Sequence, residues 1–103
     1  MASYVRVARA DEIRPGEKRV VDVDGVLVVV VNLDGQYYAI EDVCTHDGGP
    51  LGEGHLENSQ IVCPRHGARF DVRTGAALTL PAFQPVPIYE VRVVDGDILV
   101  EAF

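Results

Sequence analysis

The sequence predicts an all-β fold, in which an antiparallel base carries one inserted, loop-rich segment. Valine, whose branched side chain suits a packed sheet, occurs 18 times among the 103 residues. Three Asp-Gly dipeptides separate apolar runs, as expected for two-residue hairpin turns. Between residues 44 and 87 lie six of the ten glycines and five of the six prolines, which indicates an irregular and functional insert.

The apolar runs define the expected elements of the base in chain order. A first strand near Tyr4–Ala8 precedes a helical turn over Ala10–Ile13, which Pro15-Gly16 ends. The hairpin signals then delimit five further strands: Arg19–Val23, Val26–Leu33, Gln36–Glu41, Pro87–Val94 and Asp97–Ala102. The run Val26–Val31 is apolar without alternation, which predicts a strand buried on both faces.

The length supports a single domain over residues 1–103, with the insert at about 43–87. The net charge of −7 argues against binding to nucleic acid or to an anionic membrane surface. The longest apolar run is far shorter than the roughly 20 residues of a membrane span, and the first residues do not resemble a signal peptide. We therefore expect a cytoplasmic protein.

Two short motifs in the insert contain the residues with metal-binding chemistry. They are Cys44-Thr45-His46 and Cys63-Pro64-Arg65-His66-Gly67, and sixteen residues separate His46 from Cys63. Cysteine and histidine are ligands for iron, zinc and copper. Two loops that each offer one Cys and one His can complete a site of four ligands, so the sequence predicts a metal centre.

In these motifs the chain resembles the Rieske family, whose pattern is Cys-x-His, about 15 to 17 residues, then Cys-x-x-His. Gly49-Pro50-Leu51, Phe70-Asp71 and Thr74-Gly75 match the family as well. The resemblance implies a Rieske-like antiparallel β-sandwich or barrel base with an inserted cluster-binding subdomain. It also implies one [2Fe-2S] cluster per chain, with Cys44 and Cys63 on the inner iron and His46 and His66 on the outer iron.

Four residues differ from those of the respiratory Rieske proteins, and they indicate which subtype of the family the chain resembles. Gly49 and Arg65 replace the two cysteines that bridge the ligand loops in those proteins. Ala68 and Phe70 replace a Ser and a Tyr whose hydroxyls stabilise the reduced cluster. We expect a low potential, near the end of the Rieske range at about −150 mV.

Both departures resemble the Rieske ferredoxins of bacterial ring-hydroxylating dioxygenases. The resemblance implies a monomeric one-electron carrier between a flavin-containing, NAD(P)H-dependent reductase and a terminal oxygenase, with transient docking at the cluster tip. A Rieske oxygenase also needs a mononuclear iron, and His55 is the one histidine outside the two motifs. We therefore expect an electron carrier and no catalytic residues.

Three alternatives remain open from the sequence. Two Cys and two His also suit zinc, although zinc fingers place their His pair on a helix. Small Rieske proteins are also subunits of assimilatory nitrite reductases, and others belong to iron–sulfur assembly systems.

Each of the other candidate residues near the motifs has two alternative roles. His55 is either a docking residue or a solvated side chain near Glu53 and Glu57. Three arginines form either a basic docking patch or ordinary ion pairs: Arg65, Arg69 and Arg73. Pro81, Pro85 and Pro87 resemble the proline-containing loop that shields the cluster in this family, and they also stiffen the chain.

Overall fold

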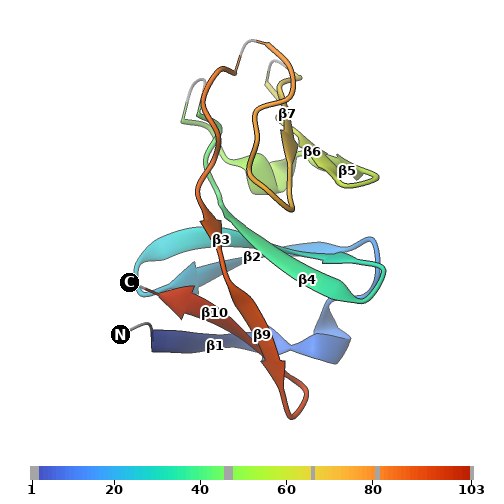
Figure 1. Cartoon of the computed structure of the whole chain (residues 1–103), viewed down its shortest axis with the longest axis vertical. Coiled ribbons are helices and arrows are strands. Elements are labelled where there is room, and N and C mark those ends of the chain that lie inside the picture. Colours follow the sequence, from blue (N-terminus) through green and yellow to red (C-terminus); the bar gives the residue numbers. More distant parts are fainter. Residues whose placement is uncertain (1–2, 46–47, 66, 81, 103) are drawn as a thin grey trace.

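The computed structural model describes residues 3–45, 48–65, 67–80 and 82–102. Strands dominate this part of the chain, and the two helical elements are single 3₁₀ turns (Figure 1). The prediction of an all-β fold is confirmed. Two sheets form the base of the molecule, and a small third sheet lies apart from them at one end (Figure 1).

The base consists of two antiparallel sheets. The first has the order β1-β10-β9, with β1 at Ser3–Arg9, β10 at Asp97–Ala102 and β9 at Val91–Val94. The second has the order β2-β3-β4-β8, with strands at Lys18–Val23, Val26–Leu33, Gln36–Glu41 and Ile88–Tyr89. The predicted strands of the base therefore agree with the structure to within one or two residues, except at the second-last strand.

The hairpin turns form where the Asp-Gly dipeptides occur. Asp24, Asp34 and Asp95 have φ angles of 50°, 53° and 51°, and the following glycines have φ of 81° to 93°. Positive φ at both central residues is the conformation that matches the twist of the flanking strands. The expected helical turn after the first strand is the 3₁₀ turn η1 at Ala10–Glu12.

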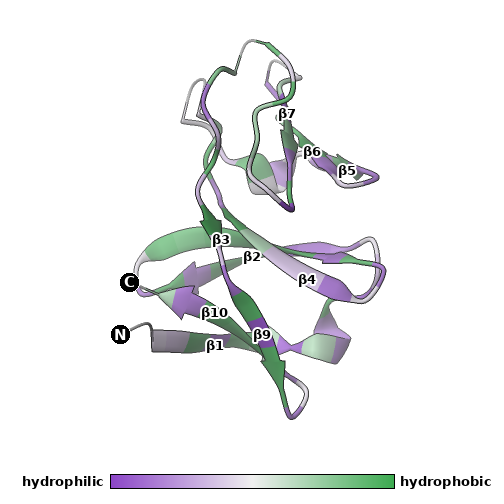
Figure 2. Ribbon diagram, viewed as in Figure 1, coloured by the Kyte–Doolittle hydropathy of each residue, from purple (hydrophilic) through white to green (hydrophobic). Residues whose placement is uncertain are grey.

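Strand β3 belongs to the sheet that separates the two hydrophobic cores of the molecule. Its residues from Val28 to Val31 are all buried. Val28 and Val30 pack in the base core, between the two sheets of the base. Val29 and Val31 pack in a second core, the insert core, on the opposite face of the same sheet. This explains the apolar run without alternation, and Figure 2 shows most of β3 in the hydrophobic colour.

The predicted strand Pro87–Val94 is divided into two by the structure. Ile88–Tyr89 (β8) pairs with β4, whereas Val91–Val94 (β9) pairs with β10 in the other sheet. Glu90 lies at the change of sheet, and its carbonyl accepts a hydrogen bond from the N–H of Glu101 at 2.9 Å. The chain thus turns a corner between the two sheets, which strands of a sandwich do at bends.

The insert contains its own short sheet, which the sequence analysis did not predict. It consists of β5 at His55–Glu57, β6 at Gln60–Val62 and β7 at Arg69–Asp71, after the 3₁₀ turn η2 at Leu51–Glu53. Asn58 has a φ of 56° in the turn between β5 and β6. The small sheet and its loops form the end of the molecule farthest from both termini (Figure 1).

Candidate metal centre

Both cysteines lie in the insert core, where they are fully buried. Cys44 comes shortly after β4 and Cys63 directly after β6. Their neighbours in this core are apolar and include Leu51, Ala68 and Phe70. Two buried thiols on two separate loops suit a metal that takes thiolate ligands and is kept from water.

The two loops have the same backbone construction. The N–H of Cys44 donates to the carbonyl of Gly49 at 2.7 Å, and the N–H of Gly48 donates to the carbonyl of Cys44 at 2.7 Å. In the second loop, the N–H of Cys63 donates to the carbonyl of Ala68 at 2.7 Å, and the N–H of Gly67 donates to that of Cys63 at 3.0 Å. Each cysteine therefore begins a turn closed by the residues four and five positions later.

A glycine closes each turn in the left-handed region, where a side chain would be strained. The φ angles are 77° at Gly48 and 73° at Gly67. The predicted ligand His46 belongs to the first turn and His66 to the second, and both histidines lie outside the described residues. Among the residues that the structure does describe, no three His, Cys, Asp or Glu side chains gather as a metal site.

A third segment, residues 78–87, is bonded to the first ligand loop and to β7, the strand that follows the second ligand loop; we call this segment the proline loop. The hydroxyl of Thr45, next to Cys44, donates to the carbonyl of Gln84 at 2.7 Å. At the other end, Leu78 and Arg69 share a backbone hydrogen bond of 2.8 Å, and the hydroxyl of Thr79 accepts from the N–H of Arg69 at 3.0 Å. Pro81 of this loop lies outside the described residues.

The side of the proline loop that faces inward completes the insert core. Ala82 and Val86 are buried in the same core as both cysteines. The N–H of Val86 donates to the carbonyl of Gly75 at 2.8 Å. A side chain at Gly75 would collide with the carbonyl oxygen of Val86, so this glycine permits the close approach.

The insert leaves the base at β4 and returns at β8, and polar contacts join these two strands; we call this junction the neck. The hydroxyl of Tyr89 donates a hydrogen bond to the Glu41 carboxylate at 2.8 Å. The N–H of Glu41 donates a hydrogen bond to the carbonyl of Pro87 at 2.9 Å. Burial first, and then the hydrogen bond to Glu41, raises the pKa of Tyr89 to about 12. The phenol is therefore protonated at neutral pH and holds the neck closed.

A second junction between base and insert centres on Gly52 of η2. Its N–H donates to the Asp42 carboxylate at 2.6 Å, and its carbonyl accepts from the Lys18 ammonium at 2.5 Å. A side chain at Gly52 would collide with Val20 of β2. The insert is therefore held against the base at more than one point.

The other candidate residues form ordinary surface contacts. His55 Nε2 lies 2.7 Å from Glu57 Oε2, and Arg69 lies 3.2 Å from the other oxygen of the same carboxylate. These hydrogen bonds, from His55 and then from Arg69, hold the pKa of Glu57 below its ordinary value. Arg73 pairs with Asp71 at 3.3 Å. At least two of the three arginines thus form ion pairs instead of a basic patch.

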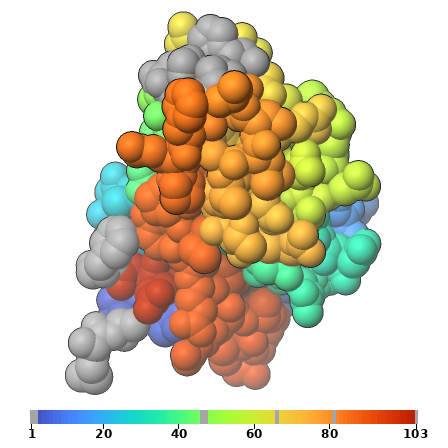
Figure 3. All heavy atoms as spheres, turned by 45° about the horizontal axis from the view of Figure 1, so that its top comes forward, coloured from blue at the N-terminus to red at the C-terminus, as the bar shows by residue number. Residues whose placement is uncertain are grey.

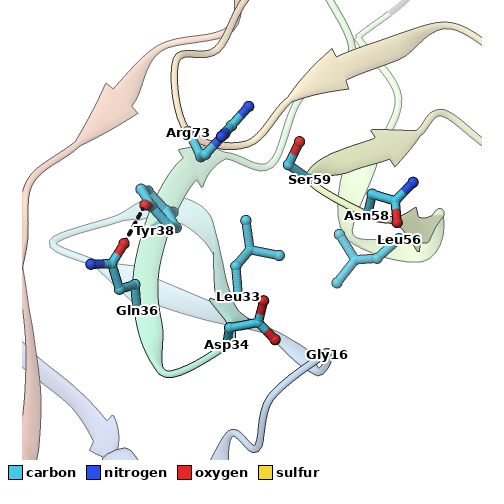
Figure 4. A pocket seen from close by; sticks show the side chains of 9 residues that line it. All are labelled: Gly16, Leu33, Asp34, Gln36, Tyr38, Leu56, Asn58, Ser59 and Arg73. Atoms are coloured by element: carbon cyan, nitrogen blue, oxygen red, sulfur yellow. Dashed lines mark hydrogen bonds between the residues drawn. The ribbon is translucent and has the colours of Figure 1, made fainter.

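A hollow of about 680 Å³ lies in the described surface, away from the cysteines. It separates the β3–β4 turn of the base from the β5–β6 turn of the insert. Figure 4 shows Leu33 and Leu56 facing one another across it, with Arg73 at one margin and Asp34 at another. Neither cysteine lines this hollow, so it does not belong to the candidate metal centre.

The sequence motifs do not indicate the roles of Thr45, Thr79 and Tyr89. Each of their hydroxyls joins separate segments of the chain, and Thr45 and Gln84 are 39 positions apart. In the sequence, only the spacing of the prolines indicates the proline loop. That spacing does not indicate which side chains hold the loop in place.

Comparison with known proteins agrees with this geometry. The family model of the Rieske [2Fe-2S] domain matches residues 3–90. The biphenyl dioxygenase ferredoxin subunit of Pseudomonas sp. (strain KKS102) is 34% identical over 100 residues, which cover 96% of this chain and 92% of that protein.

Two solved structures share the fold over nearly the whole chain. The ferredoxin of carbazole 1,9a-dioxygenase from Nocardioides aromaticivorans IC177 has a TM-score of 0.91 and 44% identity, covering 95% of this chain and 96% of that chain. A chain in the complex of reduced oxygenase and oxidized ferredoxin in carbazole 1,9a-dioxygenase has a TM-score of 0.90 and 37% identity. That match covers 94% of this chain and 91% of that one.

This chain therefore belongs to the Rieske [2Fe-2S] domain family. Within the family it is a ferredoxin, like the relatives named above. It is therefore an electron-transfer component and not a catalytic enzyme. The sequence prediction of a Rieske-type ferredoxin is confirmed, and the family supports a [2Fe-2S] cluster as the cofactor. Neither helical turn in the described part of the chain is long or apolar enough to cross a membrane.

Proposed function

We propose that Cys44 and Cys63 hold one iron of a single [2Fe-2S] cluster, and that His46 and His66 hold the other. The observation that supports this best is the matching construction of the two loops, each of which begins at a buried cysteine. A bound Rieske cluster accepts and releases one electron at a potential above that of clusters with four Cys ligands. We also propose one cluster per chain, because the chain offers one such pair of loops.

The residues around the cysteines keep water from the centre. Leu51, Phe70 and Val86 are buried in the same core as both thiols. Ala68 contributes its carbonyl to the Cys63 turn, and its methyl side chain is buried as well. In this environment the thiolates stay as ligands instead of reacting with solvent or oxidants.

We propose that the protein carries electrons from an NAD(P)H-dependent flavin reductase to a terminal oxygenase of the aromatic ring-hydroxylating type. Its relatives are named ferredoxins of such systems, and one related structure is a complex of oxygenase and ferredoxin. Each partner would dock transiently where the ligand loops reach the surface, through a small interface. The protein would act as a monomer in the cytoplasm.

The net charge of −7 supports attraction of a partner with a basic docking surface. We expect rising ionic strength to slow electron transfer, because salt screens this attraction. Rates that do not change across a salt series would reject charge steering while leaving the electron carrier itself in place.

The direct test is transfer of a single electron between purified components. The holoprotein is reduced anaerobically, mixed with the oxidised terminal oxygenase of the carbazole 1,9a-dioxygenase system of Nocardioides aromaticivorans IC177, and followed by visible absorbance. We expect one electron per chain to pass to the oxygenase. Absence of transfer, or purification of the chain only with a large enzyme subunit, would contradict the proposal.

A further inference from the structure

The proline loop exposes a group of large apolar side chains, Leu78, Leu80 and Phe83, which we call the tip patch. Phe83 is 82% exposed and Leu80 is 70% exposed, and Leu78 follows at 43%. No other large apolar side chain in the described ranges exceeds 51%. Single exposed apolar residues are common, but several of them on one short loop indicate an interaction surface.

The sequence around the tip patch has no charge. All nine basic and all sixteen acidic residues of the chain lie outside residues 74–89, in a protein with a net charge of −7. Depletion of charged residues and enrichment of aromatic ones distinguish the centres of protein interfaces from the rest of a surface. An uncharged tip on an acidic body therefore has the composition of an interface centre surrounded by a charged rim.

The structure holds the tip patch in place beside the ligand loops. Ala82, the neighbour of Phe83, is buried in the core that contains both cysteines. Thr45 bonds to Gln84 on one side of Phe83, and Thr79 bonds to Arg69 on the other. Figure 3 shows the orange of this loop spread over the tip surface, beside the green of the first ligand loop.

Exposure of Phe83 is unfavourable for the isolated protein. Burying an aromatic side chain of this size is favourable, and the fold does not use this contribution. The loop turns Ala82 and Val86 inward instead and leaves the larger side chain in water. This arrangement is favourable when a partner covers Phe83.

We infer, on the basis of the proposed function, that Phe83 is the anchor by which the terminal oxygenase recognises this ferredoxin. The partner's site would be an apolar recess that receives Phe83, with Leu78 and Leu80 at its margin. Basic residues would surround this recess, since they complement the acidic body of the ferredoxin. A buried aromatic anchor at the centre of a small interface is the usual hot spot of binding.

The test measures electron transfer to the same carbazole oxygenase, with ferredoxin that has been reduced chemically. Phe83→Ala removes the anchor, Phe83→Leu keeps an apolar side chain, and Leu27→Ala is the matched control. Leu27 is 51% exposed and lies on β3 of the base. We expect Phe83→Ala to lower the second-order rate constant about tenfold, Phe83→Leu to recover part of it, and the control to match wild type.

Three further readouts distinguish a loss of docking from a change in the cluster or in the oligomeric state. We expect the visible spectrum and the midpoint potential of Phe83→Ala to match wild type. A rate loss that follows a shifted potential would overturn the inference, since the loop would then act on the cluster. Sedimentation of the wild type as a dimer that Phe83→Ala dissociates would also overturn it, because a second copy would be the occupant.

The inference and the proposed function fail in different ways. If wild type transfers electrons and Phe83→Ala transfers them equally fast, the anchor is wrong and the ferredoxin function remains. If wild type transfers none, the proposed function fails and the anchor fails with it.

Discussion

The hydroxyl of Thr45 donates a 2.7 Å hydrogen bond to the backbone carbonyl of Gln84. Thr45 stands between the two residues of the first ligand motif, and Gln84 belongs to the proline loop. This bond therefore joins the candidate metal centre directly to the segment that covers it. It is one of several contacts that fix the position of the proline loop, together with the bonds of Leu78 and Val86.

Thr45→Val should loosen the proline loop, because valine keeps the shape of threonine but cannot donate the hydrogen bond. The loss should lower stability by about 1 kcal/mol. We expect faster amide hydrogen exchange at residues 82–86 and faster loss of iron during storage. Thr74→Val is the matched control, since the Thr74 hydroxyl accepts from the nearby N–H of Ala76, at 3.2 Å. Equal exchange in both variants would contradict a role for Thr45.

The low expected potential depends on two hydroxyls that this chain lacks. Ala68 and Phe70 are both fully buried in the core of the two cysteines. Ala68→Ser combined with Phe70→Tyr should raise the midpoint potential from a wild-type value of about −150 mV, because hydrogen bonds to a cluster favour its reduced form. Redox titration measures both proteins. A wild-type potential well above zero, or no rise in the double variant, would refute the role given to the missing hydroxyls.

The neck should open at high pH. The pKa of Tyr89 rises from its ordinary value of 10 to about 12 in the folded protein. Burial of the phenol, and then its bond to Glu41, thus contribute stability that is complete below pH 10 and is lost as the pH rises towards 12. Denaturant unfolding at a series of pH values should show this loss in wild type.

Tyr89→Phe provides the control for that titration. It should be about 1–2 kcal/mol less stable than wild type at neutral pH, since the half-buried Glu41 carboxylate loses its donor. The difference between the two proteins should disappear as the pH approaches 12. The pKa of Tyr4 is also raised, through its bond to Glu90, but Tyr4 is present in both proteins. A constant difference across the alkaline range would contradict the neck's dependence on Tyr89.

Cys44→Ser and Cys63→Ser should each abolish the cluster and the visible absorbance. Because both side chains lie in the insert core, loss of the metal should also unfold the small sheet β5–β7. Iron and sulfide analysis measures the first effect, and circular dichroism the second. Full absorbance in either variant would refute the assignment of that cysteine as a ligand.

Local chemistry made the base predictable from the sequence. Asp24, Asp34 and Asp95 with their glycines determine three turns, and a misplaced turn would reverse every side chain of the following strand. The apolar run at β3 indicated two buried faces, and a separate core lies on each of them. Spacing of the two Cys and His motifs was enough to identify the family.

Elements that depend on distant contacts were not predictable. The strands β5, β6 and β7 have three residues each and are too short for a periodic pattern. The change of sheet at Glu90 depends on which strands its neighbours pair with, and apolar spacing does not contain that information. Tertiary contacts decide both features.

The ligation of the metal is the central claim, and low-temperature electron paramagnetic resonance of the dithionite-reduced protein tests it most directly. Mixed ligation by Cys44, Cys63, His46 and His66 predicts a rhombic signal whose average g lies below that of clusters with four Cys ligands. It also predicts two irons and two sulfides per chain. A silent, colourless sample that contains zinc would contradict both the [2Fe-2S] cluster and the electron-carrier function, because two Cys and two His also bind zinc.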